Sequence, residues 1–370
     1  MKFTCDKAEL SSAITTVSRA AAVRSPIPAL EGILLEATVS VNLTGFDLKK
    51  GIYTTLEASV TESGSLVLGA RLLGEIVKKL PDGPVFFSAD EKSIAVIRGG
   101  NAEFSIIGTP AEDYPELPSM DYKSTVALPQ DVLAQMIQQT NFAVSDNESR
   151  PIYTGSLFEI QNDELTLVAV DGFRLALRRE PIDRCDVESC SFVVPGSALG
   201  DLEKICSNTG EEVRITVGSK HVSFTVGSTV LVSRLLEGEF LNYRKTVPTD
   251  FPVTVDVERA DLIRSVERVS LVIDDRTKNP LRCLFGEGEL HMSCATPLGR
   301  AEDKCPAVGD GGGLEIGFNN RYLLDALKAA PTEKLSMCLN TASTPCVLRA
   351  EDGSEVFVYM ILPVRLKAGE

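Results

Sequence analysis

The residues that most often carry chemistry are few in this chain, and their spacing selects no reaction. His221 and His291 are the two histidines, and each lies in an alternating stretch that predicts a strand. The nine cysteines include no C-x-x-C pair, so we expect reduced thiols, with neither a zinc site nor a disulfide framework. Two histidines also leave little material for a Ser–His or Cys–His catalytic pair.

The glycine-rich segments do not stand where a phosphate or dinucleotide loop would stand. "GEGEL" (286–290) and "GDGGG" (309–313) neither follow a strand nor open a helix, so we interpret them as hairpin or connecting loops. We therefore expect no cofactor. Acidic residues are numerous, and a carboxylate-dependent enzyme stays open as an alternative, although no spacing selects a pair of carboxylates.

Asp171 is the carboxylate whose setting is most specific. In "VAVDGFRLAL" (168–177) it stands between two apolar segments, as either a catalytic group or a turn residue. Asp47 and Thr296 hold the same place in two related stretches, "LTGFDLKKGIYT" and "MSCATPLGRAED". Because Asp and Thr side chains stabilise turns by bonding the backbone two residues on, the pattern favours a turn residue.

Bulk properties limit the class of protein. The chain has 370 residues, 44% of them apolar and 24% charged, which predicts a soluble protein of two or three domains. Taken alone, the net charge of −15 argues against a nucleic-acid partner, because phosphate binding requires a basic surface. The N-terminus has no secretion signal, and the longest apolar run, "VFVYMILPV" (356–364), is too short to span a bilayer. We expect a cytoplasmic protein without a membrane partner.

The elements that position these residues repeat along the chain. A short strand followed by an amphipathic helix recurs about every 60 residues, six times. The six copies are 1–20, 64–83, 125–144, 190–210, 253–272 and 312–332. Alternating strand patterns fill the remainder, which predicts an α+β fold of three similar domains at 1–121, 122–248 and 249–370.

The exposed faces of the predicted helices are less acidic than the chain as a whole. Their polar residues include Arg71, Glu75, Lys78, Lys79, Gln135, Gln138, Gln139, Arg259, Arg264, Glu267, Arg268, Arg321 and Lys328. One such face is usually no more than a solvated surface. Six equivalent helices with neutral or mildly cationic faces are harder to dismiss as solvated surface, and pseudo-symmetry would place those faces on a common side.

Five motifs together resemble the bacterial DNA polymerase III beta subunits, the replicative sliding clamps. They are "RSPIPALEGILLE" (24–36), "DGFRLAL" (171–177), "LLEGEFLNYRKTVP" (235–248), "NPLR" (279–282) and "MILPVRL" (360–366). The resemblance implies three repeated clamp domains, a head-to-tail homodimeric ring around double-stranded DNA, and no catalytic activity. It also implies short-peptide partners: the replicative polymerase alpha subunit, the clamp loader and other clamp-motif proteins.

The resemblance also implies three sets of site residues. For a peptide-binding pocket they are Tyr153, Val170, Gly172, Phe173, Arg174, Leu175, Leu241, Lys245, Thr246, Asn319, Tyr322, Cys346, Met360, Ile361, Leu362, Pro363, Val364, Arg365 and Leu366. For DNA contact they are Arg24, Arg71, Asn147, Arg150 and Ile152, and for the dimer seam Phe104, Ile106, Val272 and Ile273. Arg174 is expected to lay its stem along the pocket wall with its guanidinium outward.

A binding module of this kind is the leading hypothesis, and two others stay open: the carboxylate-dependent enzyme and a purely structural repeat protein. Size in solution separates the clamp from both, because a clamp dimer has twice the 39.9 kDa mass of the chain.

Overall fold

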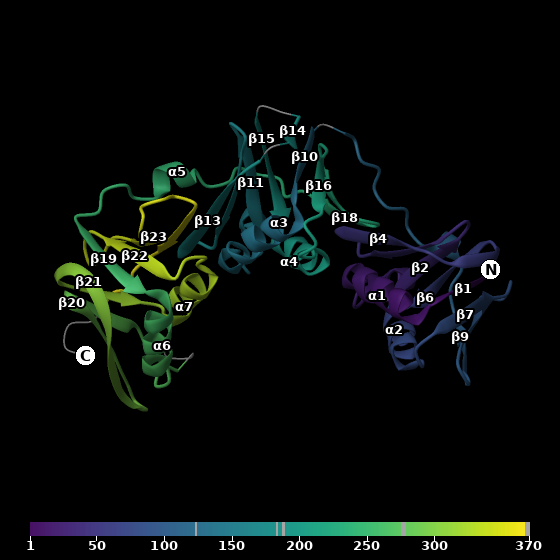
Figure 1. Cartoon of the computed structure of the whole chain (residues 1–370), viewed down its shortest axis with the longest axis horizontal. Coiled ribbons are helices and arrows are strands. Elements are labelled where there is room, and N and C mark those ends of the chain that lie inside the picture. Colours follow the sequence, from purple (N-terminus) through teal and green to yellow (C-terminus); the bar gives the residue numbers. More distant parts are fainter. Residues whose placement is uncertain (123, 183, 187–188, 275–278, 367–370) are drawn as a thin grey trace. The chain divides into compact units, whose positions relative to one another are not determined.

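The computed structural model describes residues 1–122, 124–182, 184–186, 189–274 and 279–366 (Figure 1). These residues form two compact units. The first contains 1–133, 201–235 and the described part of 183–187. The second contains 134–182, the described part of 188–200, and the described residues from 236 onward.

Each predicted strand–helix repeat is present as a strand followed directly, or after one residue, by a helix. The six pairs are β1 (Lys2–Asp6) with α1 (Lys7–Val17), β6 (Gly64–Gly69) with α2 (Ala70–Lys79), β10 (Ser124–Pro129) with α3 (Gln130–Gln138), β15 (Ser189–Pro195) with α4 (Gly196–Ile205), β19 (Val253–Glu258) with α6 (Arg259–Ser270), and β21 (Gly299–Phe318) with α7 (Asn320–Ala329). Asp6 begins the first helix because its carboxylate accepts hydrogen bonds from the backbone N–H groups of Ala8 and Glu9. The repeat prediction is confirmed.

Two antiparallel sheets build the first unit. The smaller has the order β5-β1-β7-β8-β9 and the larger β14-β10-β16-β17-β18-β4-β3-β2-β6. Their further strands are β2 (Gly32–Ala37), β3 (Val41–Phe46), β4 (Lys50–Leu56), β5 (Ser59–Glu62), β7 (Pro84–Ala89), β8 (Ile94–Gly99), β9 (Ala102–Ile107), β14 (Arg184–Cys185), β16 (Glu212–Val217), β17 (His221–Val226) and β18 (Thr229–Arg234). Strand β9 is therefore an edge strand.

One sheet dominates the second unit, in the order β15-β11-β12-β13-β24-β23-β22-β19-β21-β20. Its further strands are β11 (Gly155–Gln161), β12 (Glu164–Val170), β13 (Arg174–Pro181), β20 (Leu281–Thr296), β22 (Lys334–Leu339), β23 (Cys346–Ala350) and β24 (Phe357–Ile361). Helix α6 packs against α7 and against the long strands β20 and β21 (Figure 1). Strand β20 ends this sheet and is an edge strand.

The sheets cross the predicted domain borders. Strand β18 pairs with β4, placing Leu231 opposite Ile52, and β13 pairs with β24, placing Leu175 opposite Met360. Strands of the region 122–248 are consequently shared between the sheets of both units, because backbone pairing continues from one repeat to the next. The borders at 121/122 and 248/249 stay a prediction.

The histidines and cysteines lie in ordinary structural positions. His221 is in β17 and His291 in β20, so the strand prediction for both is confirmed. The cysteines whose side chains are described carry free thiols, and burial raises the pKa of Cys5 and Cys206 to about 12. Within the described residues, His, Cys, Asp and Glu side chains do not gather in threes where they could ligate a metal ion.

Candidate peptide-binding, DNA-binding and subunit surfaces

Asp171 is a turn residue. Its Oδ1 accepts hydrogen bonds from the backbone N–H groups of Phe173 (2.8 Å) and Arg174 (3.0 Å). Asp47 Oδ1 accepts in the same way from Lys49, and the Thr296 hydroxyl accepts from Leu298. The turn interpretation is therefore confirmed at all three repeats. Gly172 follows Asp171 with φ +92°, a left-handed conformation that glycine adopts without strain.

Arg174 points inward, and the expectation of an outward guanidinium was wrong. Its Nε donates to Asp171 Oδ2 (2.9 Å), its Nη1 to Asp325 Oδ2 (2.6 Å) and its Nη2 to the carbonyl of Phe142 (2.6 Å). The guanidinium carbon lies 4.4 Å from the ring centre of Tyr322. Only 11% of the side chain is exposed. Two carboxylates and a carbonyl supply hydrogen-bond partners that offset the cost of burying the charge.

The floor of the predicted pocket is a row of apolar residues on neighbouring strands. Val170 of β12 lies opposite Leu175 of β13, which lies opposite Met360 of β24. We call Val170, Leu175 and Met360 the floor row. All three are at most 5% exposed, and Leu175 and Met360 belong to one apolar cluster against which Ile152 and Leu241 pack.

An aromatic pair and the start of the C-terminal segment lie beside this floor. Phe173 is 58% exposed, and its ring stacks 6.1 Å from that of Tyr322. The backbone N–H of Leu362 donates to the carbonyl of Phe173, and that of Val364 donates to the carbonyl of Gly317. Leu362, Pro363, Val364 and Leu366 are partly buried and Arg365 is exposed.

Two predicted pocket residues, Cys346 and Ile361, face away from the floor row. Cys346 and Ile361 are fully buried in the core cluster on the opposite face of the sheet from Leu175 and Met360. Asn319 begins α7, where its side chain accepts hydrogen bonds from the N–H groups of Arg321 and Tyr322. Lys245 is exposed, Thr246 is partly buried, and Tyr153 packs edge-on against Phe240 at 5.6 Å. For Cys346 and Ile361 the orientation follows from strand alternation, because consecutive residues of a strand point to opposite faces of the sheet.

The residues predicted to contact DNA are mostly exposed. Arg24 is exposed in the first unit, and 93% of the Arg71 side chain is exposed, with its Nε 3.2 Å from Glu75. In the second unit Asn147 and Arg150 are exposed, whereas Ile152 packs against the apolar cluster that contains Leu175 and Met360. Ile152 therefore contributes packing of that segment rather than an exposed contact surface.

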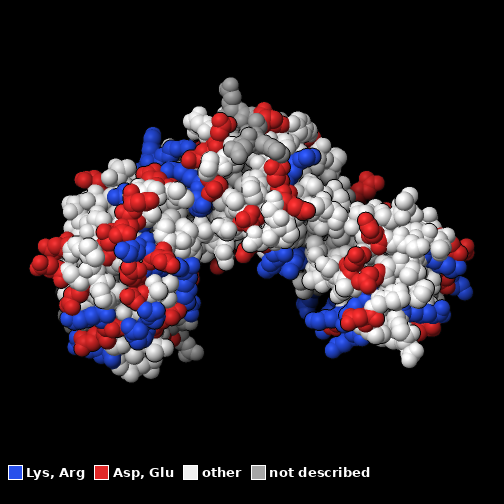
Figure 2. All heavy atoms as spheres, viewed as in Figure 1, with Lys and Arg blue, Asp and Glu red and all other residues white. Residues whose placement is uncertain are grey.

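The helix faces carry more paired charge than the sequence pattern indicates. Arg264 pairs with Asp261, Arg268 with Asp303 and Lys328 with Glu267. Gln139 is buried rather than exposed, because its Oε1 accepts a hydrogen bond from Arg178 Nε at 2.8 Å. In Figure 2, Lys and Arg side chains are interspersed with Asp and Glu over the visible surface. The surface seen in this view is therefore mixed in charge.

Both predicted seam segments adjoin edge strands. Phe104 and Ile106 are partly buried on β9, and their neighbour Ile107 is 83% exposed. Val272 and Ile273 are partly buried directly after α6 and pack against the core of the second unit. The Thr296 hydroxyl donates to the carbonyl of Val272.

Three exposed apolar residues that the sequence analysis did not name adjoin the two predicted seam segments. They are Ile107, Leu271, which is 84% exposed, and Leu298, which is 74% exposed. Leu271 adjoins Val272 in the chain, and the Thr296–Val272 hydrogen bond brings the turn that carries Leu298 to the same segment. The sequence did hold a signal for Ile107 and Leu271, because each is an apolar residue next to a predicted seam residue, Ile106 or Val272.

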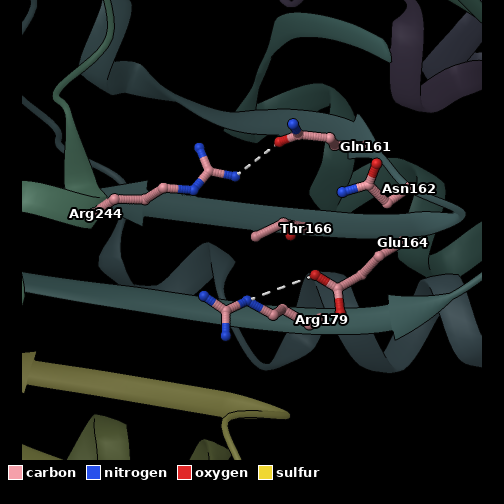
Figure 3. A pocket seen from close by; sticks show the side chains of 6 residues that line it. All are labelled: Gln161, Asn162, Glu164, Thr166, Arg179 and Arg244. Atoms are coloured by element: carbon pink, nitrogen blue, oxygen red, sulfur yellow. Dashed lines mark hydrogen bonds and ion pairs between the residues drawn. The ribbon is translucent and has the colours of Figure 1, made fainter. Parts of the chain in front are cut away.

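A polar pocket of about 300 Å³ lies on the same face of the sheet as the floor row. Figure 3 shows Arg244 reaching toward Gln161 on one side, Arg179 beside Glu164 on the other, and Thr166 between them. Asn162 completes the lining. No sequence motif pointed to this pocket, because its residues come from strand ends and from the distant segment that carries Arg244.

Comparison with known families decides the classification. Family models of the DNA polymerase III beta subunit match in order along the chain: the N-terminal domain at 1–118, the central domain at 127–242 and the C-terminal domain at 244–365. The chain belongs to the bacterial DNA polymerase III beta subunit family. Its function is that of a sliding clamp, the non-catalytic subunit that gives the replicative DNA polymerase processivity.

Relatives match this beta subunit over nearly its whole length. The beta sliding clamp of Synechocystis sp. is 34% identical and that of Staphylococcus epidermidis 32%, with at least 99% of each chain covered. The crystal structure of the Bacillus subtilis DNA polymerase sliding clamp is 32% identical, with 99% of this chain and 100% of that chain covered and a TM-score of 0.94. Among the described residues, no helix has the length and apolar character to cross a membrane.

Proposed function

We propose that two copies of the chain form a head-to-tail ring that encloses duplex DNA in the cytoplasm. The observation that carries this proposal is the ordered match of three clamp-domain models to one chain. Two edge strands, β9 and β20, support it, since pairing them between copies would remove both exposed edges. Apolar residues accompany each edge: Phe104 and Ile106 on β9, and Val272 and Ile273 near β20.

DNA contact in such a ring is electrostatic and weak. Tight phosphate contacts would add affinity through counterion release and would also resist sliding. The exposed Arg24 and Arg71, in a chain of net charge −15, suit loose tethering. Asn147 and Arg150 are proposed as further contacts.

The double change Arg24→Ala with Arg71→Ala is expected to shorten DNA residence and flatten its salt dependence. The slope of log affinity against log salt should fall by about 0.9 for each arginine that contacts a phosphate. Binding measured across a salt series on unrelated sequences checks this, with no change in sequence preference. Arg98→Ala, which removes an exposed arginine paired with Glu103, serves as control. An unaltered slope in the double variant would remove both arginines from the DNA surface.

We also propose that the floor row, the Phe173–Tyr322 pair and the 362–366 segment bind short peptides of polymerases, of the clamp loader and of other partners. Two large apolar peptide side chains would each contribute roughly 1.5–3 kcal/mol when buried. Ordering a flexible peptide costs several kcal/mol and offsets much of this gain, so we expect a weak complex. Such affinity suits exchange between partners, and a dimer would offer two sites.

Leu362→Asp is expected to weaken peptide binding about 10- to 150-fold, because it replaces apolar contact worth roughly 1.5–3 kcal/mol. Fluorescence anisotropy with a labelled peptide from the same organism's replicative polymerase alpha subunit measures the change. Leu362 is a cleaner target than Met360, where a carboxylate would be buried in the apolar cluster. Leu48→Asp, at a 52% exposed leucine of the first unit, is the matched control. Equal affinities in the Leu362 variant and the control would exclude this site.

A further inference from the structure

The polar pocket and the floor row lie on the same face of one sheet, at different positions along strands β12 and β13. Glu159 of β11 lies opposite Thr166 of β12, which lies opposite Arg179 of β13; we call these three the polar row. The floor row lies four residues further along β12 and β13, about 14 Å away at about 3.4 Å per residue. A peptide side chain seated on the floor row is therefore about four residue spacings from Glu159.

One short segment bridges this distance. Tyr243 of α5 (Tyr243–Thr246) is 3% exposed and packs in the same apolar cluster as Leu175 and Met360. Leu241 on its N-terminal side packs against that cluster too, and Lys245 and Thr246 follow in α5. We call residues 241–246 the wall segment; it carries the predicted pocket residues Leu241, Lys245 and Thr246.

The wall segment cannot hold its own conformation. Helix α5 is one turn long, and isolated helices this short are not stable in water. Asn242 caps it by accepting a weak hydrogen bond from the Lys245 N–H at 3.3 Å. Its position must therefore come from contacts with the sheet.

Glu159 supplies the polar contacts, in addition to the apolar packing of Tyr243 and Leu241. Its Oε1 accepts a hydrogen bond from Arg244 Nη1 at 2.9 Å, and its Oε2 accepts from Arg244 Nη2 and from the hydroxyl of Tyr243. The guanidinium of Arg244 also lies 4.8 Å from the ring centre of Tyr243. Only 20% of the Glu159 side chain is exposed. Bidentate, partly buried pairing of this kind fixes orientation as well as adding energy.

We propose that Glu159 is a positioning residue for peptide binding: through Tyr243 and Arg244 it holds the wall segment against the floor row. The proposal rests on the peptide-binding function proposed above. It assigns a role in recognition to a carboxylate whose oxygens already accept hydrogen bonds from Tyr243 and Arg244.

Glu159 stays ionised at neutral pH, so its hydrogen bonds with Tyr243 and Arg244 persist there. Burial raises the pKa of its carboxyl, but the hydrogen bonds from Arg244 and Tyr243 and the charges of Arg244 and Arg179 outweigh burial and lower it. Because the pKa of the Glu159 carboxyl is lowered in the folded protein, its contribution to stability is fully present above the ordinary carboxyl pKa. That contribution is lost only as the pH falls through the lowered pKa. Burial and the bond to Glu159 also raise the pKa of Tyr243, so its hydroxyl stays a donor at neutral pH.

Glu159→Gln tests the proposal, because it keeps the side chain's shape and removes its charge. Hydrogen exchange at the backbone amides of Lys245 and Val247 should become at least about tenfold faster, since charged hydrogen bonds are lost. Affinity for the labelled polymerase alpha-subunit peptide should fall about three- to tenfold. Glu164→Gln, a 48% exposed glutamate 3.7 Å from Arg179 in the same pocket, should leave both unchanged.

A second variant keeps the test decisive. Adding Arg244→Gln to Glu159→Gln should cause little further loss, because both changes break one interaction. The proposal is overturned if exchange at the wall segment stays at the wild-type rate, or if exchange rises while peptide affinity does not change. Failure of the wild-type protein to bind the peptide would instead refute the proposed peptide-binding function, and the positioning role with it.

Discussion

Phe104→Arg is expected to convert the protein from a dimer of twice 39.9 kDa into folded monomers. Phe104 lies on the edge strand β9, and an arginine at a buried seam loses roughly 1.5–3 kcal/mol of apolar burial and adds the cost of a buried charge. A two-copy ring has two such seams. A total near 6 kcal/mol raises the dimer dissociation constant by about four orders of magnitude. Sedimentation velocity measures the change.

Phe104→Arg needs a matched control, because the ring of Phe104 lies on the same side of the sheet as the buried Phe87 and Ile97. An arginine there could disturb the packing of its own subunit as well as the seam. Phe86→Arg provides one, because Phe86 is 54% exposed in the same five-stranded sheet. Both variants should keep the wild-type circular dichroism spectrum, and only Phe104→Arg should dissociate. A Phe104 variant that stays dimeric would place the seam elsewhere.

Arg174→Ala is expected to cause the largest loss of stability. It leaves the Asp171 carboxylate, 11% exposed, without its ion-pair partner and removes the hydrogen bond to the carbonyl of Phe142. Breaking a buried pair in this way costs about 3–5 kcal/mol. The midpoint of urea unfolding should fall, and hydrogen exchange in β13 and α7 should accelerate, because the guanidinium joins these two elements.

Two further variants serve as comparisons. Arg174→Lys keeps the positive charge at position 174, and Arg300→Ala removes an exposed arginine. Lysine keeps the charge but cannot donate in three fixed directions, so it should rescue only part of the stability. Arg300→Ala removes an arginine that is 73% exposed and 3.8 Å from Glu302, and it should cost less than about 1 kcal/mol. If the alanine variant at 174 unfolds no earlier than the one at 300, the buried network is not a source of stability.

The features that sequence alone predicted are local or repeated ones. Amphipathic spacing placed six strand–helix pairs, since burial of one helix face follows directly from the order of residues. Asp171 was assigned as a turn residue because its side chain bonds the adjacent backbone, and the same chemistry recurs at Asp47 and Thr296. Neither inference required knowledge of distant contacts.

The features that sequence did not predict depend on distant partners. Arg174 is turned inward by Asp325, 151 residues away, and Gln139 is buried by its bond to Arg178. Cys346 and Ile361 are a different case: they lie behind the sheet, away from Met360, by the local alternation of β23 and β24, whereas the family resemblance had implied them for the pocket. The role proposed for Glu159 arises from Tyr243 and Arg244, 84 and 85 residues away. No local pattern encodes such pairs.

Retention on closed and open DNA tests the ring most directly. The protein is loaded by its ATP-driven clamp loader onto a nicked circular plasmid, and half of the sample is then linearised with a restriction enzyme before gel filtration. A ring holds DNA by enclosing it, so the protein should remain with the circular DNA and leave the linear DNA through its ends. Equal retention on the two forms would show binding by contact alone and would contradict the proposed encircling clamp.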